Sequence, residues 1–217
     1  TCGLCTNRCK LTINLFSGKD RFISGNRCER PLGRGAGESL PNAYAYKLKR
    51  LLSFAPAKDA PRGRIGLPLG LNMYENLPFW HTLLTGLGFE VVLSGAASRN
   101  TYLKGQFTIP SDTVCYPAKL MHGHIEELLE QGVDTIFYPC MTYNFNERTG
   151  DNHYNCPVVA YYPELLEANV SHLANVRFLK PFFALHDRDK FRKCGARFFE
   201  KEFGVGKKEF ASALPAA

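Results

Sequence analysis

Four cysteines near the start of the chain stand at a spacing that suits a metal site. Cys2, Cys5 and Cys9 form the pattern C-x2-C-x3-C, and Cys28 follows after a predicted hairpin. Four thiolates suit a tetrahedral Zn²⁺ ion or a cubane iron–sulfur cluster, and either group replaces the core that so short a segment cannot build. The spacing does not choose between zinc and iron–sulfur, and free thiols without a ligand role are the alternative.

Two further cysteines fall where predicted elements begin or end. Cys115 precedes Pro117, which suits the first turn of a helix, so Cys115 is placed at a helix N-terminus, where the macrodipole favours the thiolate. Cys140 follows the apolar run Thr135–Tyr138 and ends a predicted strand. In a parallel sheet these two positions share the carboxyl edge, so we expect Cys115 and Cys140 to face one another as metal ligands or nucleophile. A small buried hydrophobe is the alternative for Cys115.

The last two cysteines are less clear. Cys156 precedes Val158–Tyr161, which we interpret as a strand, and this would place Cys156 at the opposite edge of the sheet unless the loop 141–155 carries it back. A long loop inside a compact domain is often functional, so Cys156 stays a candidate third ligand. Cys194 shares a predicted helical face with Phe191, Phe198 and Phe203, and we expect it in the core.

Polar residues near the same edge complete the candidate site. Lys119, one helical turn after Cys115, either balances the charge of a bound cluster or is a solvated side chain. Glu75 is a candidate catalytic carboxylate in a carboxyl-edge loop, together with the polar residues Asn72, Ser111 and Asp112.

Two histidines on the helix after Cys115 are weaker candidates. His122 and His124 are two residues apart and therefore point in different directions on a helix. We expect His122 to face the site and His124 to face solvent, with metal ligation by neither favoured.

The elements that position these residues divide the chain into three parts. These are a Cys-rich hairpin at residues 1–32, a linker and helix at 33–62, and an α/β lobe at 63–217. In the lobe, short apolar runs alternate with amphipathic segments, which predicts a three-layer α/β fold with a mostly parallel sheet. The predicted strands are Ile65–Leu69, Glu90–Leu93, Phe107–Ile109, Thr135–Tyr138 and Val158–Tyr161; the predicted helices are Asn76–Leu87, Pro117–Glu130, Glu164–Asn169 and Arg188–Phe203.

Composition limits the class of protein. The chain has 217 residues, 45% of them hydrophobic and 12% aromatic, which is enough to bury a core and excludes low-complexity disorder. No uncharged apolar run approaches the ~20 residues of a membrane span. Eight cysteines beside an ordinary core indicate a reducing compartment, so we expect a cytoplasmic protein. The net charge of +7 comes from scattered residues without an interleaved aromatic stripe, so nucleic-acid binding is not expected.

Longer motifs resemble a known family. They are Ile65–Pro68, Asn72–Glu75, Pro78–His81, Ile109–Lys119, His122–His124, Phe137–Cys140 and Asp151–Pro157. They are similar to the domain found in large acyl-CoA dehydratase activase-related proteins, relatives of 2-hydroxyglutaryl-CoA dehydratase and benzoyl-CoA reductase components of anaerobic bacteria. The segments Cys2–Cys9 and Ser24–Arg30 resemble the region that precedes this domain in the same proteins.

The resemblance implies a flavodoxin-like lobe that holds a [4Fe–4S] cluster through three cysteines, here Cys115, Cys140 and Cys156. It also implies an ATP-hydrolysing activase of actin-like fold that supplies a low-potential electron for dehydration of an acyl-CoA-type substrate. The sequence carries no nucleotide-binding motif, so the ATP-driven step would belong to another part of a longer parent chain, from which a chain that begins at Thr1 looks excised. The alternative is a zinc-stabilised docking module that positions an activase against a separate dehydratase.

Overall fold

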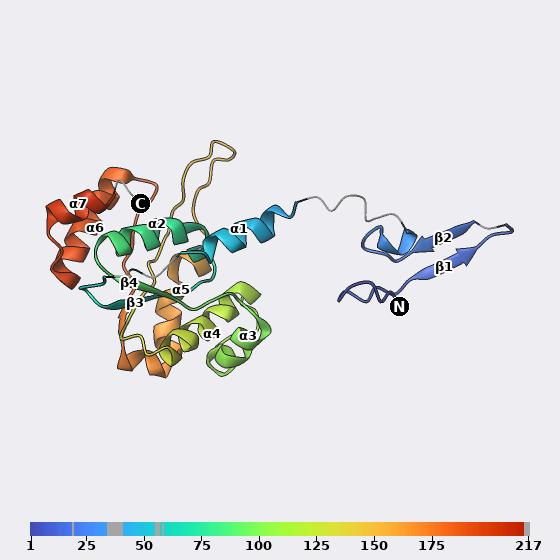
Figure 1. Cartoon of the computed structure of the whole chain (residues 1–217), viewed down its shortest axis with the longest axis horizontal. Helices are drawn as coiled ribbons and strands as arrows, with labels where there is room; N and C mark the ends of the chain where they lie inside the picture. Colours follow the sequence, from blue (N-terminus) through green and yellow to red (C-terminus); the bar gives the residue numbers. More distant parts are fainter. Residues whose placement is uncertain (19, 34–40, 55–56, 58, 215–217) are drawn as a thin grey trace. The chain divides into compact units, whose positions relative to one another are not determined.

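The computed structural model describes residues 1–18, 20–33, 41–54, 57 and 59–214 (Figure 1). The chain forms two compact units, Thr1–Tyr46 and Lys47–Ala217. The boundary falls inside the segment 33–62 that the sequence assigns to a linker and a helix. Helix α1 (Ala43–Leu51) forms within this segment, whereas the glycine-rich part of the predicted linker, residues 34–40, lies outside the described residues.

The first unit contains a small antiparallel hairpin and little core. Strand β1 (Thr12–Leu15) pairs with β2 (Arg21–Ser24), and a short 3-10 helix, η1 (Arg30–Leu32), follows. In its described part only Cys2 and Ile23 are buried. The backbone N–H of Cys2 donates to the Cys9 carbonyl over 2.8 Å, so the segment ahead of the hairpin folds back on itself. Metal binding by the four cysteines of this unit stays a prediction.

The second unit is built on a four-stranded parallel sheet, which confirms the α/β class. The strands lie in the order β4 (Glu90–Leu93), β3 (Arg64–Leu67), β5 (Thr135–Phe137) and β6 (Arg177–Leu179). Gly66 at the centre of β3 pairs with Val92 on one side and Ile136 on the other. The predicted strand at Glu90–Leu93 is confirmed to the residue.

Helices cover both faces of this sheet (Figure 1). On one face, Trp80 lies 5.1 Å from Phe137 and 5.9 Å from Phe191, measured between ring centroids. On the other face, a Cβ added to Gly66 would lie 3.2 Å from Leu128. The first face therefore carries α2 (Met73–Gly86), α6 (Arg188–Phe203) and α7 (Lys207–Ala213); the second carries α3 (Arg99–Gly105), α4 (Tyr116–Glu130) and α5 (Pro157–Asn169). Among the described helices, none is both long and apolar enough to cross a membrane.

Two predicted strands are wrong. The segment Val158–Tyr161 belongs to α5, which begins at Pro157, where the missing N–H of proline removes no helical hydrogen bond. Pro163 lies inside the same helix. A proline is usually found at the start of a helix and not in its interior, which is why the sequence predicts a helix that begins only at Glu164. The segment Phe107–Ile109 overlaps the 3-10 helix η2 (Gln106–Thr108). The fourth strand of the sheet is instead β6, which follows the 3-10 helix η3 (Ser171–Asn175).

The backbones of α3 and α4 approach each other at two glycines. A Cβ on Gly123 would lie 1.6 Å from the carbonyl oxygen of Thr101, and a Cβ on Gly105 would lie 2.2 Å from the Gly123 nitrogen. Glycine is the only residue that allows this approach. The close contact joins α3 to α4, and α4 carries Cys115 at its N-terminus.

Candidate functional site

The strand order marks one place in the sheet where a crevice is expected. From β3 the chain crosses to β4 on one side and then returns to β5 on the other side of β3. In open parallel sheets, ligands bind at the carboxyl ends of strands where the winding changes direction in this way. The switch point here lies between β3 and β5, and Cys140 comes shortly after the end of β5.

Cys140 is buried and fixed by its backbone. Its N–H donates to the Pro181 carbonyl over 2.8 Å, and its own carbonyl accepts from the Phe183 N–H over 3.1 Å. Burial raises the pKa of the Cys140 thiol to about 12, helped by the nearby Glu164 and opposed by Lys180. The thiol is therefore protonated at neutral pH, and a metal ion bound there would have to displace this proton.

Cys115 and Cys156 occupy equivalent positions at the starts of two helices. Cys115 caps α4 with φ −62° and ψ 151°, and Cys156 caps α5 with φ −61° and ψ 153°. A proline follows each of them in the first helical turn, neither side chain forms a capping hydrogen bond, and both residues are exposed. The placement of Cys115 agrees with its sequence prediction. The expectation that Cys156 lies at the opposite edge unless its loop carries it back is corrected, because Cys156 precedes a helix and helices here begin at the carboxyl edge.

Two buried tyrosines lie among these cysteines. Desolvation raises the pKa of Tyr138, and the charges of Cys140, Tyr162 and Cys156 raise it further. The pKa of Tyr162 rises to about 12 because of burial and because Cys115 lies nearby. The hydroxyl of Tyr138 is buried without a hydrogen-bond partner among the described residues. Tyr138 therefore lies near Cys140 and Cys156, and Tyr162 lies near Cys115.

The cysteines share an edge of the sheet without forming a closed ligand set. Across the described ranges, which include all eight cysteines, no three Cys, His, Asp or Glu side chains are close enough to hold one metal ion. This holds for the carboxyl-edge cysteines and for Cys2, Cys5, Cys9 and Cys28 alike.

The two polar candidates have partners of other kinds. The Lys119 ammonium donates to the Asp112 carbonyl over 2.8 Å, which ties the first turn of α4 to the preceding loop. The Glu75 carboxylate forms an exposed ion pair with Lys47 of α1 at 3.2 Å. Lys119 therefore stays close to the Cys115 loop, while the contacts of Glu75 link it to α1.

Both histidines of α4 are buried, so the expectation that His124 faces solvent is wrong. His122 lies 2.7 Å from the Thr108 hydroxyl through Nδ1 and 3.0 Å from the Tyr162 hydroxyl through Nε2. His124 Nδ1 lies 2.9 Å from Ser94 Oγ, which also accepts the Leu69 N–H over 2.8 Å. Burial lowers the pKa of both histidines to about 4. His122 thus holds the hydroxyl of Tyr162 in place beside the cysteines.

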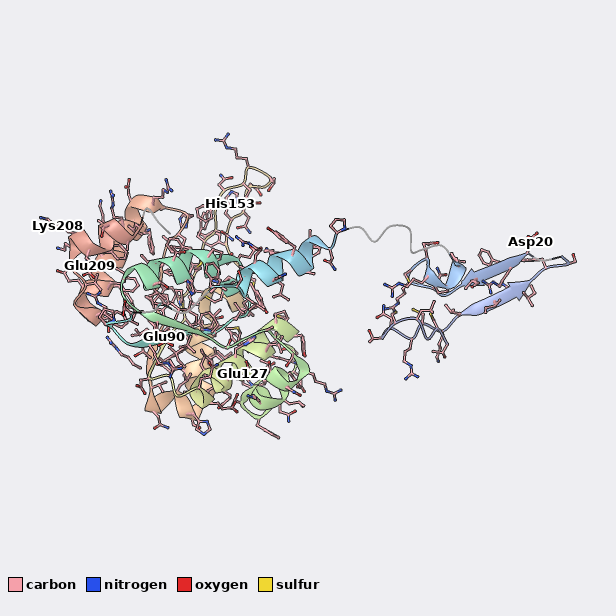
Figure 2. All side chains as sticks on the ribbon, in the orientation of Figure 1. Asp20, Glu90, Glu127, His153, Lys208 and Glu209 are labelled. Atoms are coloured by element: carbon pink, nitrogen blue, oxygen red, sulfur yellow. The ribbon has the colours of Figure 1, made fainter. Side chains whose placement is uncertain are left out.

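A partly buried carboxylate completes the polar network around His124. Glu127 on α4, labelled in Figure 2, accepts a hydrogen bond from the Thr101 hydroxyl over 2.8 Å. Its other carboxylate oxygen lies 3.7 Å from His124 Nδ1. Together with Ser94, these side chains join α3, α4 and the end of β4, and thus fix the orientation of α4.

Sequence reasoning missed the two tyrosines, and one of them has a local signal. Side chains alternate along a strand, so residues 138 and 140 share a face. Phe137 accordingly packs on Trp80 of α2. Tyr138 lies instead near Tyr162 of α5 and near Cys156, which caps that helix. Tyr162 has no such signal, because its position depends on α5, which the sequence predicts incorrectly.

Comparison with known proteins places the lobe in a family. Residues 64–217, more than half of the chain, match the family described as the CoA enzyme activase uncharacterised domain. The chain belongs to this family. The match confirms the predicted relationship to acyl-CoA dehydratase activase-related proteins. No curated protein and no solved structure matches the chain. Within this activase-family domain lie Cys115, Cys140 and Cys156, whereas Cys2 to Cys28 precede the matched range.

The cysteines of the domain should differ sharply in reactivity. In metal-free, reduced protein, we expect Cys140 to be alkylated by iodoacetamide at least a hundredfold more slowly than Cys115 and Cys156. The rise of its pKa from 9.0 to about 12 alone lowers its thiolate fraction ~1000-fold. Peptide mass spectrometry after timed labelling measures the three rates.

Cys194 supplies the internal reference for this experiment. It is exposed, contrary to its predicted core position, because the buried stripe of α6 runs through Phe191, Gly195 and Phe199 and leaves Cys194 beside it. Cys140 should react as fast as Cys194 once guanidinium unfolds the protein. Equal rates for the two in the native protein would contradict the buried position of Cys140.

Proposed function

We propose that this domain binds an iron–sulfur cluster through Cys115, Cys140 and Cys156 and takes part in ATP-coupled, low-potential electron transfer for dehydration of an acyl-CoA-type substrate. The observation that carries the proposal is the gathering of three cysteines from three separate elements at the carboxyl edge beside the switch point. The strand order also supports a flavodoxin-like lobe, since the second, first, third and fourth strands of the lobe lie side by side as in that fold.

The donor set fits a cluster in its chemistry. Three thiolates leave one iron without a protein ligand, which is the arrangement that allows a further group to bind the metal. The positive ends of the α4 and α5 dipoles at Cys115 and Cys156 would attract the negative charge of a bound cluster. Because no three side chains are close enough as they stand, cluster binding requires the exposed side chains of Cys115 and Cys156 to move towards Cys140.

The chain's own residues would act mainly by binding and orienting. Lys119 would balance negative charge beside Cys115, held in place by its hydrogen bond to the Asp112 carbonyl. Glu75 would act as a proton-transfer group only after release from Lys47. ATP hydrolysis would occur in an actin-like activase domain elsewhere in the parent chain.

We propose a second, structural metal in the first unit, held by Cys2, Cys5, Cys9 and Cys28. The hydrogen bond from the Cys2 N–H to the Cys9 carbonyl brings the first and third of these residues near one another. A metal would also supply the stability that a hairpin with so few buried residues lacks.

A zinc-stabilised docking module is the second candidate, favoured by the apolar surface of the hairpin. Leu15 is 78% exposed, Phe16 60% and Phe22 57%, although the unit has little core of its own. Exposed apolar residues grouped in this way suit contact with a partner protein. In this case the lobe cysteines would be structural.

Metal analysis of anaerobically purified protein separates the two functions. We expect about four irons and four sulfides per chain to persist when Cys2, Cys5, Cys9 and Cys28 are all replaced by Ser, and to be lost in Cys115→Ser. Cys115 is exposed, so its replacement leaves the fold intact, and Cys194→Ser is the matched control that keeps its iron. Zinc without iron in the wild-type protein would overturn the cluster proposal and favour docking.

A further inference from the structure

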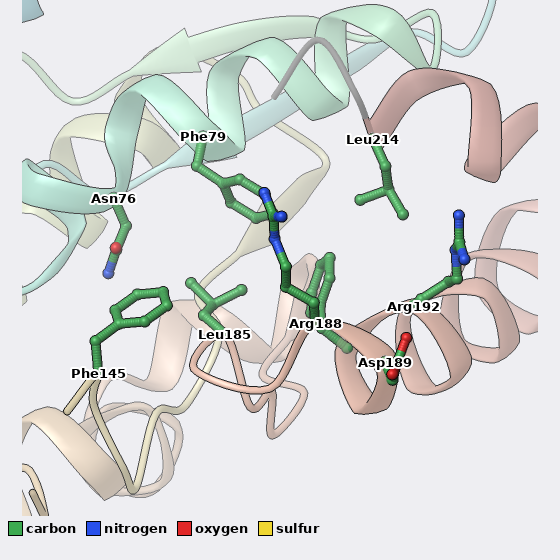
Figure 3. Close-up of a pocket in the computed structure, with 9 residues that line it drawn as sticks. Asn76, Phe79, Phe145, Leu185, Arg188, Asp189, Arg192 and Leu214 are labelled. Atoms are coloured by element: carbon green, nitrogen blue, oxygen red, sulfur yellow. The ribbon is translucent and has the colours of Figure 1, made fainter.

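A pocket on the α2 and α6 face lies beside the carboxyl edge of the sheet (Figure 3). Its volume is about 640 Å³, within the range of small-molecule sites. Asn76 on α2 lines it, and the Asn76 amide also donates to the Met141 sulfur over 3.3 Å. Met141 directly follows Cys140, so the pocket borders the switch point from the face opposite to Tyr138.

One side of the pocket is apolar. Phe79, Leu185 and Phe191 line it, and the last two are buried in the core of the lobe. Phe145, on the loop after β5, is 53% exposed and adds an aromatic ring at the rim. A hydrocarbon or aromatic group in the pocket would therefore remove apolar surface from water on both sides of the contact.

The other side carries positive charge. Arg188 and Arg192 lie one turn apart at the start of α6, and Figure 3 shows Arg188 reaching into the space between Phe79 and Leu214. Asp189 also lines the pocket, so the charge of these three side chains sums to +1. Among the described residues, no ion pair or hydrogen bond engages the guanidinium group of either arginine. A guanidinium group offers a fork of donors that matches a carboxylate or a similar oxyanion.

We propose that this pocket binds an amphiphilic organic anion, with the anionic group on Arg188 and Arg192 and the apolar body against Phe79, Leu185 and Phe191. The apolar wall and the two arginines line the same pocket, which neither a purely polar anion nor a neutral hydrocarbon would use fully. The proposal concerns residues outside the cysteine site, so it holds whether or not a metal binds there.

Competition binding with a fluorescent probe tests this proposal. Anilinonaphthalene sulfonate, itself an aromatic body with an oxyanion, is titrated into the full chain and then displaced by octanoate, octanol or acetate. We expect saturable binding with one probe per chain, and displacement by octanoate at concentrations about tenfold lower than by octanol. Acetate, which lacks the apolar body, should displace the probe only weakly.

Three variants assign the site. The double variant R188Q/R192Q should weaken octanoate binding about tenfold or more and remove its advantage over octanol. The matched control K193Q/R197Q removes the same charge from exposed α6 positions outside the pocket and should leave binding within about twofold of wild type. Phe145→Ser, at an exposed position, should weaken octanoate and octanol alike.

Clear outcomes would overturn the proposal. These are no saturable probe binding by the wild-type chain, unchanged octanoate binding by R188Q/R192Q, or an equal loss in K193Q/R197Q. The last result would mean that general positive charge rather than the pocket attracts the anion. Circular dichroism on each variant verifies that the fold is retained before binding is compared.

Discussion

Gly123→Ala is expected to destabilise the lobe by about 3 kcal/mol or more. The added Cβ would lie 1.6 Å from the carbonyl oxygen of Thr101, and neither this Cβ nor the helical backbone that carries the oxygen can rotate aside. Helices α3 and α4 must therefore separate, which also weakens the hydrogen bond between Thr101 and Glu127. Urea unfolding followed by circular dichroism measures the loss.

Gly86→Ala is the matched control for this substitution. Gly86 is also helical, but its added Cβ would meet the Ala213 Cβ at 3.5 Å, an ordinary contact. Alanine is the better helix former, so we expect no loss of stability and a gain of up to about 1 kcal/mol. If Gly123→Ala unfolded at the same urea concentration as wild type, the close approach of α3 and α4 would be wrong.

Acid should destabilise the lobe steeply because of the two fully buried histidines of α4. The pKa of His122 and His124 is about 4 in the folded protein and near 6.5 in the unfolded chain. Between these values the unfolded chain binds more protons, so the free energy of unfolding falls as the pH falls from about 6.5 to about 4. Each histidine contributes on the order of 3 kcal/mol to this loss. Above about pH 7 the contribution of these two histidines to the free energy of unfolding no longer changes. Urea unfolding at closely spaced pH values measures the slope.

Histidine variants assign the acid sensitivity. His124→Gln removes one titrating group and should flatten the slope between pH 6.5 and 4, although the variant is less stable at pH 7 because its contact with Ser94 changes. His172→Gln is the control for replacing a histidine at the surface, since His172 is 67% exposed and contacts Glu126 rather than the buried network of His124. A slope in His124→Gln as steep as in wild type would assign the acid sensitivity to carboxylates instead.

Local signals account for the parts of the fold that the sequence predicts correctly. Helix α6 is predicted to the residue, because its apolar face lies between an Asp187 cap and Gly204 with φ 67°. Strand β6 is missed because only Leu179 of its three residues is buried, whereas β5, which has the same length, has two buried residues. Pairing with β5 makes these residues a strand. Helix α5 is misjudged because valines, tyrosines and Pro163 oppose a helix locally, while burial of Tyr162 and Leu166 in the lobe stabilises one.

The candidate site divides in the same way. Cys115 is placed correctly, since a proline after a cysteine is a local helix-start signal. Cys156 carries the same signal before Pro157, but the strand predicted after it obscured this. The burial of His124 depends on Ser94, which follows β4 and meets α4 only in the folded lobe. No sequence spacing reports such a contact.

Trp80 gives the molecule an optical reporter of its own. It is the single tryptophan of the chain and lies on α2, fully buried against the sheet and α6. Its indole should emit at short wavelength in the native lobe and at longer wavelength once water reaches it. Phe79 lies 4.8 Å from the indole and also lines the pocket, so ligand binding and unfolding can both be followed by fluorescence without any label.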